Sequence, residues 1–130
     1  MIAGIGIDIV DIDRMALAIS RRPNIVKKIL TDSELKDLGL LSVAVFSDSD
    51  IASIAARFAC KEATVKSIDS SLFEIGLQSI EVLRNEVTGA PKLSVSSIKA
   101  QGLSFLCSIT HSDKSAAAVV IAQSSSSPSS

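Results

Sequence analysis

The fold is decided by the stretch Arg57-Phe58-Ala59-Cys60-Lys61-Glu62-Ala63-Thr64-Val65-Lys66. It belongs to a segment that begins after the polar cluster Asp48-Ser49-Asp50 and continues to about Ile68. With one residue every 100° around a helix, the larger apolar residues of this segment share one stripe, namely Ile51, Ile54, Ala55, Phe58 and Val65. Glu62 falls within the same stripe. The pattern predicts one long helix with a carboxylate in the middle of its apolar face.

The position of Glu62 needs an explanation, because an ionised carboxylate on a core-facing stripe is costly unless a partner compensates it. One explanation is an ion pair with Lys66, which lies at i+4 in the favourable order of Glu then Lys. The other is a metal ion or an active-site cleft. The helical pattern alone does not decide between these two explanations.

Asp8 raises the same question on a predicted strand, Ile2 to Val10. Alternation places Asp8 on one face with Gly4 and Gly6, while the opposite face carries only isoleucine. Glycine in a strand lets another backbone or a ligand approach closely. The alternative is a solvated face with an ordinary surface aspartate. Together with Glu62, Asp8 supplies the two carboxylates that commonly hold Mg²⁺ beside phosphate oxygens and water.

Basic residues lie on both flanks of Glu62 along the predicted helix. Arg57 and Lys61 share one flank, and Lys66 lies on the other. This arrangement suits a phosphate ester bridged by a metal, and it equally suits a solvated helix flank with incidental ion pairs.

Two further features carry both a functional and an ordinary interpretation. The single histidine, His111, follows an apolar strand and precedes Ser112, so it could contact a phosphate, act as a base, or be structural. A basic stretch early in the chain is either surface charge or a docking patch for an acidic protein; it comprises Arg14, Arg21, Arg22, Lys27 and Lys28.

Composition bounds the class of protein. The chain has 130 residues, 47% of them hydrophobic, with a net charge of −1 and neither Trp nor Tyr. These values predict one domain over residues 1–123. The net charge gives no electrostatic reason to expect nucleic-acid binding. A domain of this size also makes an oligomer unsurprising. No apolar run reaches the length of a membrane span and no signal peptide is recognised, so a soluble cytoplasmic protein is expected. Cys60 and Cys107 are expected to be buried, reduced thiols, and the serine-rich residues 124–130 a disordered tail.

The remaining elements mix helices and strands without strict alternation. Helices are expected after Asp11 or Asp13, over 24–30, after the capping-box sequence of residues 31–34, and over 96–101. Strands are expected over 80–86, 92–95, 103–110 and 116–122. The predicted class is α+β, with a small mixed or antiparallel sheet packed on one long helix and shorter helices.

Four segments resemble the motifs of bacterial holo-[acyl-carrier-protein] synthases, in the same order. Residues 4–15, GIGIDIVDIDRM, are similar to the opening G-I-G-x-D-I-V-E-I-x-R-I. Residues 57–66 resemble R-F-A-x-K-E-A-x-x-K, and residues 85–93 resemble N-x-x-G-x-P-x-L. Residues 108–112, followed by the apolar run 116–121, resemble S-I-[ST]-H-[ST] and the closing strand. The resemblance covers residues 2 to about 122.

The resemblance implies a 4′-phosphopantetheinyl transferase fold and a transfer of 4′-phosphopantetheine from coenzyme A to a serine of apo acyl carrier protein, which releases adenosine 3′,5′-bisphosphate. Asp8 and Glu62 match the family's Mg²⁺ ligands. Positions near coenzyme A are matched by Arg57, Lys66, Pro91, His111 and Ser112. Arg14 matches a contact to the carrier protein, and the family's homotrimer places the site between subunits.

On this family basis, Asp8, Glu62 and Lys66 are the expected catalytic residues. Glu62, directly or through a metal-bound water, would accept the serine proton, and Lys66 would stabilise or protonate the leaving phosphate.

The chain departs from the family after Lys66. Where the family continues A-F/L-G-T-G, this chain has Ser67-Ile68-Asp69-Ser70-Ser71, so the loop glycines are replaced and an acid is added. An alternative therefore stands beside the enzyme: a degenerate, non-catalytic homologue that still trimerises and binds carrier protein.

Overall fold

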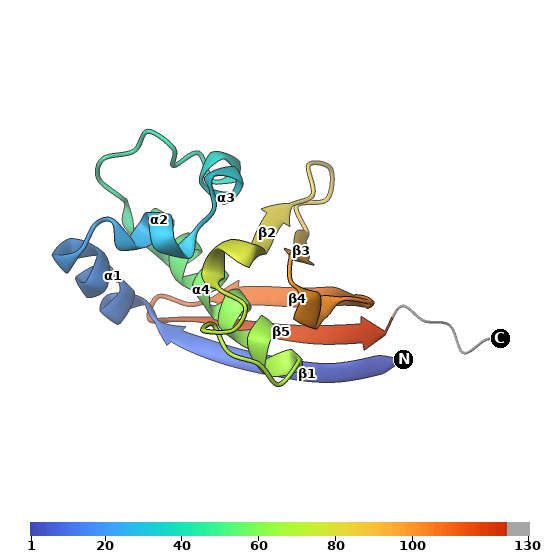
Figure 1. Ribbon diagram of the computed structural model, residues 1–130. Helices are drawn as coiled ribbons and strands as arrows, with labels where there is room; N and C mark the ends of the chain where they lie inside the picture. The colour runs from blue at the N-terminus through green and yellow to red at the C-terminus, as the bar shows by residue number, and fades with distance from the viewer. Residues whose placement is uncertain (125–130) are drawn as a thin grey trace.

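A computed structural model describes residues 1–124 of the chain (Figure 1). Within these residues there are four α-helices, α1 (Ile12–Arg21), α2 (Ile25–Ile29), α3 (Asp32–Asp37) and α4 (Asp48–Ser67). There are five strands, β1 (Ile2–Asp11), β2 (Ile80–Arg84), β3 (Pro91–Val95), β4 (Leu103–His111) and β5 (Ser115–Ser124). Two short 3₁₀ turns, η1 (Leu77–Ser79) and η2 (Ile98–Ala100), lie in the connections.

The strands form two antiparallel sheets. One sheet has three strands in the order β1-β5-β4, and the other is the hairpin β2-β3. Helix α4 crosses one face of the three-stranded sheet, while α1, α2 and α3 gather at one end of the molecule (Figure 1). The expected α+β class and the expected packing of a small sheet on one long helix are confirmed; the sheets are purely antiparallel.

The glycine face of β1 lies directly against α4. A Cβ atom on Gly4 would come within 1.9 Å of the Ser67 carbonyl oxygen, and one on Gly6 within 2.0 Å of the Ala63 carbonyl oxygen. Side chains cannot occupy such positions, so glycine is required for this close approach. The partner that the two glycines admit is therefore the backbone of α4.

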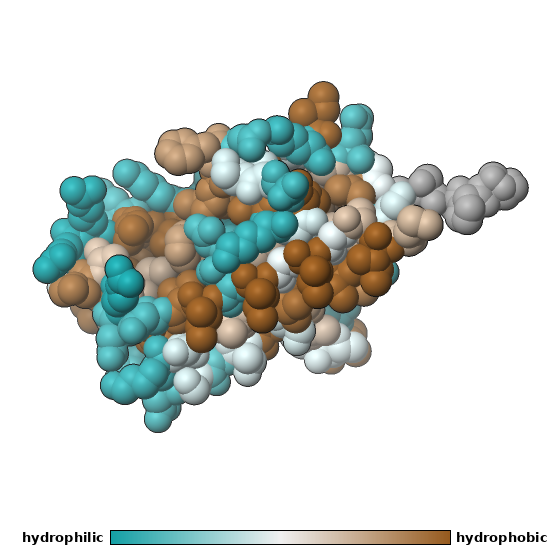
Figure 2. All heavy atoms as spheres, turned by 90° about the horizontal axis from the view of Figure 1, so that it is seen from below, coloured by the Kyte–Doolittle hydropathy of each residue, from teal (hydrophilic) through white to brown (hydrophobic). Residues whose placement is uncertain are grey.

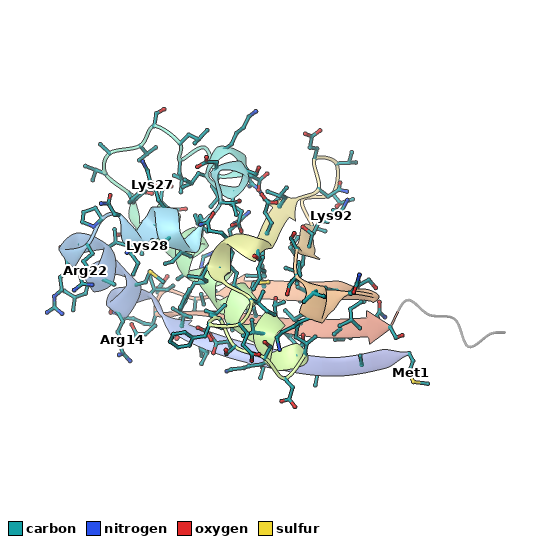
Figure 3. All side chains as sticks on the ribbon, viewed as in Figure 1. Met1, Arg14, Arg22, Lys27, Lys28 and Lys92 are labelled. Atoms are coloured by element: carbon teal, nitrogen blue, oxygen red, sulfur yellow. The ribbon has the colours of Figure 1, made fainter. Side chains whose placement is uncertain are left out.

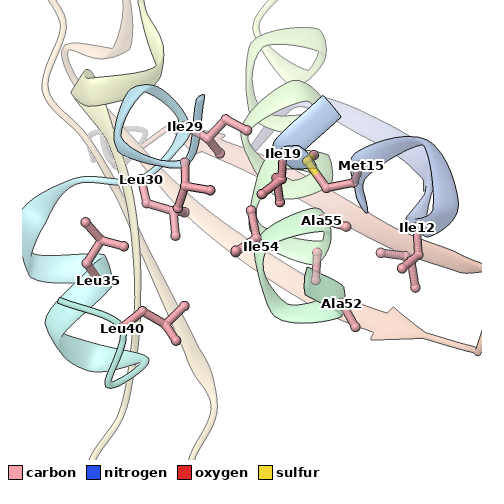
Figure 4. Packing of buried hydrophobic residues seen from close by; sticks show 13 residues of the cluster. Ile12, Met15, Ile19, Ile29, Leu30, Leu35, Leu40, Ala52, Ile54 and Ala55 are labelled. Atoms are coloured by element: carbon pink, nitrogen blue, oxygen red, sulfur yellow. The ribbon is translucent and has the colours of Figure 1, made fainter. Parts of the chain in front are cut away.

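The buried core is mainly aliphatic, in line with an aromatic content of only 3%. Figure 4 shows Ile12, Met15 and Ile19 of α1 packed toward Ala52, Ile54 and Ala55 of α4. On the other side of α4 the same cluster continues through four residues of α2, α3 and the segments that follow them, Ile29, Leu30, Leu35 and Leu40. A second cluster joins α4 to β2, β3 and the sheet.

A buried ion pair ties the helical end of the molecule together. Lys61 Nζ lies 2.6 Å from Glu34 Oε1, and both side chains have no solvent exposure. The ammonium also donates to the carbonyl oxygens of Ile29 and Leu77 at 2.6 and 3.0 Å. Glu34 accepts from the backbone N–H groups of Thr31 and Val82 at 2.9 and 3.0 Å. Lys61 therefore fits neither alternative for its flank, a phosphate site or a solvated surface, because its charge is satisfied inside the protein.

Several boundaries differ from the expected ones for local reasons. Helix α4 includes the cluster 48–50, because Ser47 is its N-cap and forms a capping box with Asp50. Strand β2 ends at Arg84, because the Asn85 side chain accepts from the N–H groups of Val87 and Thr88 and closes the turn. The helix expected over 96–101 is only the turn η2.

The two cysteines are free thiols, as expected, although Cys107 is only half-buried. Ser124 ends β5, and the rest of the predicted tail, 125–130, lies outside the described residues. In the part of the chain that is described, no helix combines the length and apolar character needed to cross a bilayer.

The outer face of the three-stranded sheet is apolar and exposed. The β1 side chains that point away from α4 are Ile5, Ile7 and Ile9, exposed by 65, 68 and 68%. Ile5 lies beside Ile121 of β5, which lies beside the exposed Leu106 of β4, so the row crosses the sheet. Figure 2, viewed from below Figure 1, shows brown, hydrophobic side chains in a row over β1. Contiguous apolar surface of this kind indicates an interaction site.

Gly6→Ala is expected to destabilise the protein by about 1 to 3 kcal/mol, because the added methyl group meets a backbone carbonyl that cannot rotate away. Urea denaturation measures the change. Ser94→Ala, at an exposed position of β3, is the matched control and should leave stability almost unchanged. Wild-type stability of Gly6→Ala would contradict the close approach.

Lys61→Met is expected to cost about 3 to 5 kcal/mol, because it leaves the Glu34 carboxylate buried without its counter-charge. Lys99 also pairs with a glutamate, Glu74, but both side chains are about half exposed. Lys99→Met is therefore the control, and its thermal midpoint should stay close to that of the wild-type protein. Equal midpoints for the two variants would show that the buried pair contributes nothing special.

Candidate functional site

The close approach of β1 to α4 brings three predicted site residues together. Lys66, in the last turn of α4, donates from Nζ to Asp8 Oδ1 at 3.0 Å and to the Ile7 carbonyl oxygen at 3.1 Å. Glu62 lies one helical turn before Lys66. The ion pair considered for Glu62 is thus formed by Lys66 with Asp8 instead.

Glu62 is left with an electrostatic penalty. Burial raises the pKa of the Glu62 carboxyl above its ordinary value, the negative charge of Asp8 raises it further, and Lys66 acts in the opposite direction. Among residues 1–124, no hydrogen bond or ion pair is found for this carboxylate. Two neighbouring acids with one shared cation favour an additional positive charge, such as a metal ion.

A groove of about 560 Å³ opens beside the two carboxylates. Asp8 and Glu62 line it together, and its apolar walls come from α1, α2, α4 and η1, through Met15, Ala18, Ile25, Ile29, Phe58 and Leu77. Arg14 and Lys28 also line the groove. It thus combines acids that suit a cation with an apolar wall and bases that suit an anionic partner.

The carboxylate pair fits a Mg²⁺ site that is completed from outside the chain. In the described part of the chain, no group of three or more His, Cys, Asp or Glu side chains could hold a metal ion. Mg²⁺ is commonly held by one or two carboxylates, with water and substrate phosphates as the other ligands. Asp8 and Glu62 meet that pattern.

Arg57 is engaged elsewhere. Its side chain is 8% exposed, its Nη2 lies 2.9 Å from Asp37 Oδ2, and its Nε donates to the Val82 carbonyl oxygen at 3.1 Å. Burial lowers the pKa of this guanidinium, while the carboxylates of Glu34 and Asp37 work to raise it. The structure therefore places Arg57 in the contact of α4 with α3 and β2. Its expected contact to coenzyme A stays a prediction.

Pro91 lies near the same corner of the molecule. It opens β3 and pairs with Arg84 of β2, whose guanidinium also approaches Asp37, at 3.4 Å. Pro91 and Arg57 are therefore linked through Asp37 and Arg84, and neither lines the groove of Asp8 and Glu62.

His111 and Ser112 line a different hollow, of about 410 Å³, at the turn between β4 and β5. This hollow shares no lining residue with the groove of Asp8 and Glu62. Its walls include Asp113, of the same turn as His111, together with Asp13 and Asp48, which sequence reasoning did not connect with His111. No local pattern could have done so, because Asp13 and Asp48 lie far from His111 in the sequence.

The basic stretch forms one end of the molecule. Figure 3 shows Arg14 on α1, Arg22 directly after the end of α1, and Lys27 and Lys28 on α2. Arg14 projects away from the body of the protein, and it belongs to the groove that Asp8 and Glu62 line. Sequence reasoning did not assign Lys28 to the site, although it belongs to the same basic stretch.

Comparison with known proteins accounts for this arrangement. Residues 4–122 match the family model of the 4′-phosphopantetheinyl transferase superfamily. The chain belongs to this superfamily. It is 38% identical over 124 residues to a holo-[acyl-carrier-protein] synthase of Enterococcus faecalis, covering 95% of this chain and 99% of the relative. A second relative of that name, from Halalkalibacterium halodurans, is 39% identical over 122 residues, with coverage of 93 and 95%.

Solved structures of the superfamily share the fold. A holo-(acyl-carrier-protein) synthase from Bacillus anthracis in complex with CoA (3′,5′-ADP) superposes with a TM-score of 0.80 at 30% identity, covering 95% of this chain and 98% of that one. A holo-[acyl-carrier-protein] synthase from Helicobacter pylori in complex with coenzyme A gives 0.75 at 27% identity, with coverage of 92 and 99%.

This member of the 4′-phosphopantetheinyl transferase superfamily keeps the helix end despite its altered loop. Asp69 has φ = +57°, the only positive value for a non-glycine residue in the described chain. The Asp69 and Ser70 N–H groups donate to the Lys66 and Val65 carbonyl oxygens at 3.2 and 2.8 Å, the Schellman arrangement. Aspartate tolerates this conformation better than most residues. The missing glycine therefore leaves the backbone path that ends α4 intact.

Proposed function

We propose that this chain transfers 4′-phosphopantetheine from coenzyme A to a serine of apo acyl carrier protein and releases adenosine 3′,5′-bisphosphate. The observation that carries the proposal is the meeting of Asp8 and Glu62 at the contact of β1 with α4, with Lys66 beside them. The family match over residues 4–122 and the coenzyme A named in the complexes of similar proteins support the substrate.

Mg²⁺ is the proposed cofactor, with Asp8 and Glu62 as its protein ligands. When bound, it would neutralise charge on the pyrophosphate of coenzyme A and so favour displacement at phosphorus. The raised pKa of Glu62 supports this assignment, because a nearby cation would offset the repulsion from Asp8.

Glu62 and Lys66 are the groups of this chain placed to move protons and stabilise charge. Glu62, directly or through a water, would accept the proton of the attacking serine, and its raised pKa brings it closer to the value suited to a base. Lys66 is half exposed, so its ammonium can turn toward the leaving phosphate.

A homotrimer is the proposed assembly, with coenzyme A bound between neighbouring subunits. The exposed row of Ile5, Ile7 and Ile9 supplies an apolar face for association. His111 and Ser112 lie in a separate hollow from Asp8 and Glu62. A site between subunits would allow the hollow of one chain to complete the groove of the next.

The proposed docking surface for the acyl carrier protein is the basic end of the molecule, with Arg14 as the contact nearest the site. Arg14 lines the groove of Asp8, so an acidic partner held there would present its serine beside the carboxylates. The expected cytoplasmic location fits such substrates and stays a prediction.

The test is incubation with apo acyl carrier protein, coenzyme A and Mg²⁺, followed by mass spectrometry for the gain of phosphopantetheine on the carrier. Transfer is expected and should stop when the metal is chelated. Glu62→Gln should lower the rate about 100-fold or more, as loss of a positioned base does. Lys66→Ala should also lower it strongly.

Controls separate the parts of this proposal. Arg14→Glu should raise the KM for carrier protein and leave the KM for coenzyme A unchanged. Normal turnover of Glu62→Gln, or of Lys66→Ala, would remove the assigned role of that residue. No transfer with any divalent metal would favour the non-catalytic homologue.

Ile7→Lys tests the assembly, because a charge in the middle of the exposed apolar row should prevent association. Analytical ultracentrifugation is expected to show a trimer for the wild-type protein and a monomer for this variant. Val87→Lys changes a 93% exposed residue in the β2–β3 turn and should stay trimeric. A wild-type monomer, or a trimeric Ile7→Lys variant, would contradict the proposed interface.

A further inference from the structure

The contact of Lys66 with Asp8 has a consequence for metal binding. The Lys66 ammonium lies 3.0 Å from Asp8 Oδ1 and also donates to the backbone oxygen of Ile7 at 3.1 Å. It therefore sits on one of the two carboxylates proposed to hold Mg²⁺. The Asp8 side chain is only 18% exposed.

A divalent cation that coordinates Asp8 Oδ1 would compete with the Lys66 ammonium for the same oxygen. An Asp8 oxygen that accepts a hydrogen bond from Lys66 offers less of its lone-pair density to a metal. The two positive charges also repel each other at the short distances that a shared carboxylate imposes. Binding of the metal is thus coupled to departure of the ammonium.

The Lys66 side chain can move away from Asp8 without unfolding the C-terminal end of α4. Its side chain is 51% exposed, in contrast to Lys61, whose ammonium is fully buried in the same helix. A long, half-exposed side chain can change rotamer at little cost, and its ammonium is readily hydrated. The backbone of α4 at this point is held independently by the hydrogen bonds of Asp69 and Ser70.

We propose that Lys66 is an internal competitor of the divalent cation at Asp8, so that metal entry releases its ammonium toward the donor phosphates. The proposal rests on the proposed metal site at Asp8 and Glu62. It gives Lys66 two positions: against Asp8 in the metal-free protein, and turned away from Asp8 when the metal is bound. The Lys66 ammonium therefore reaches the donor phosphates only when the metal is bound.

The test measures Mn²⁺ binding to the protein without coenzyme A or carrier protein, from the electron paramagnetic resonance signal of free Mn²⁺. Lys66→Met keeps the length of the side chain and removes its charge. It is expected to bind Mn²⁺ roughly tenfold more tightly than the wild-type protein, a difference of about 1.4 kcal/mol. Lys66→Arg keeps the charge and should retain the wild-type affinity, and Lys99→Met, which removes a lysine paired with Glu74, should do the same.

A second readout follows the ammonium itself. Lys66 should be acetylated faster by a small amine reagent when Mg²⁺ is added, and Lys99 provides the internal reference. In Asp8→Asn, Lys66 should react fast with or without metal. Thermal unfolding of each variant verifies that it is folded.

The outcomes separate this inference from the proposed function. If Asp8→Asn loses Mn²⁺ binding but Lys66→Met binds no more tightly than wild type, the metal site stands and the competition is wrong. If Asp8→Asn binds Mn²⁺ as the wild-type protein does, the metal site itself is wrong and the competition falls with it. If neither binds Mn²⁺ without coenzyme A, Lys66 has no cation to compete with in the free protein and the competition is wrong. Metal-independent acetylation of Lys66 in the wild-type protein would likewise overturn the inference.

Discussion

The structure depends on how closely β1 can approach α4. Gly4 and Gly6 leave no Cβ atoms between the strand and the carbonyl oxygens of Ser67 and Ala63, so the two backbones pack almost directly. That contact sets the position of Asp8, the next residue on the same face of the strand, relative to the last turns of the helix. Rigid elements at a fixed separation hold side chains from different segments in a constant relative position.

The charged residues of α4 differ in how deeply they are buried. Lys61 is fully buried and ion-paired with Glu34, and its further hydrogen bonds to the Ile29 and Leu77 carbonyl oxygens connect the segments around α2 and η1 to the helix. Such a pair is tolerable inside a protein only when every donor and acceptor is satisfied, as it is here. Glu62 is only partly buried and Lys66 is exposed, so these two side chains of the same helix stay accessible. One helix therefore carries a buried structural ion pair and two residues of the proposed site, Glu62 and Lys66.

The single chain holds its site residues in separate places. Asp8, Glu62, Lys66 and Arg14 gather at the groove or directly beside it, while His111 and Ser112 line another hollow. Arg57 is held by Asp37 and Val82 near Pro91. An apolar outer sheet face adds a reason for association, because leaving Ile5, Ile7 and Ile9 in water forgoes hydrophobic stabilisation that a neighbouring copy would supply. In the proposed trimer, association through this sheet would also bring the separated residues of neighbouring subunits together.

The sequence by itself determined the α+β class, the long helix and the capping box at Thr31, since local spacing and turn chemistry carry these features. The family motifs added the prediction that Asp8 and Glu62 lie together, and both line one groove. The sequence could not determine which basic residues of α4 face solvent. Arg57 and Lys61 share a flank in the sequence pattern, yet their depth depends on Asp37 and Glu34, which lie in a distant segment. Only the tertiary structure decided that Lys66 pairs with Asp8 rather than with Glu62, because the glycines of β1 bring a carboxylate from 58 positions away within reach of the ammonium.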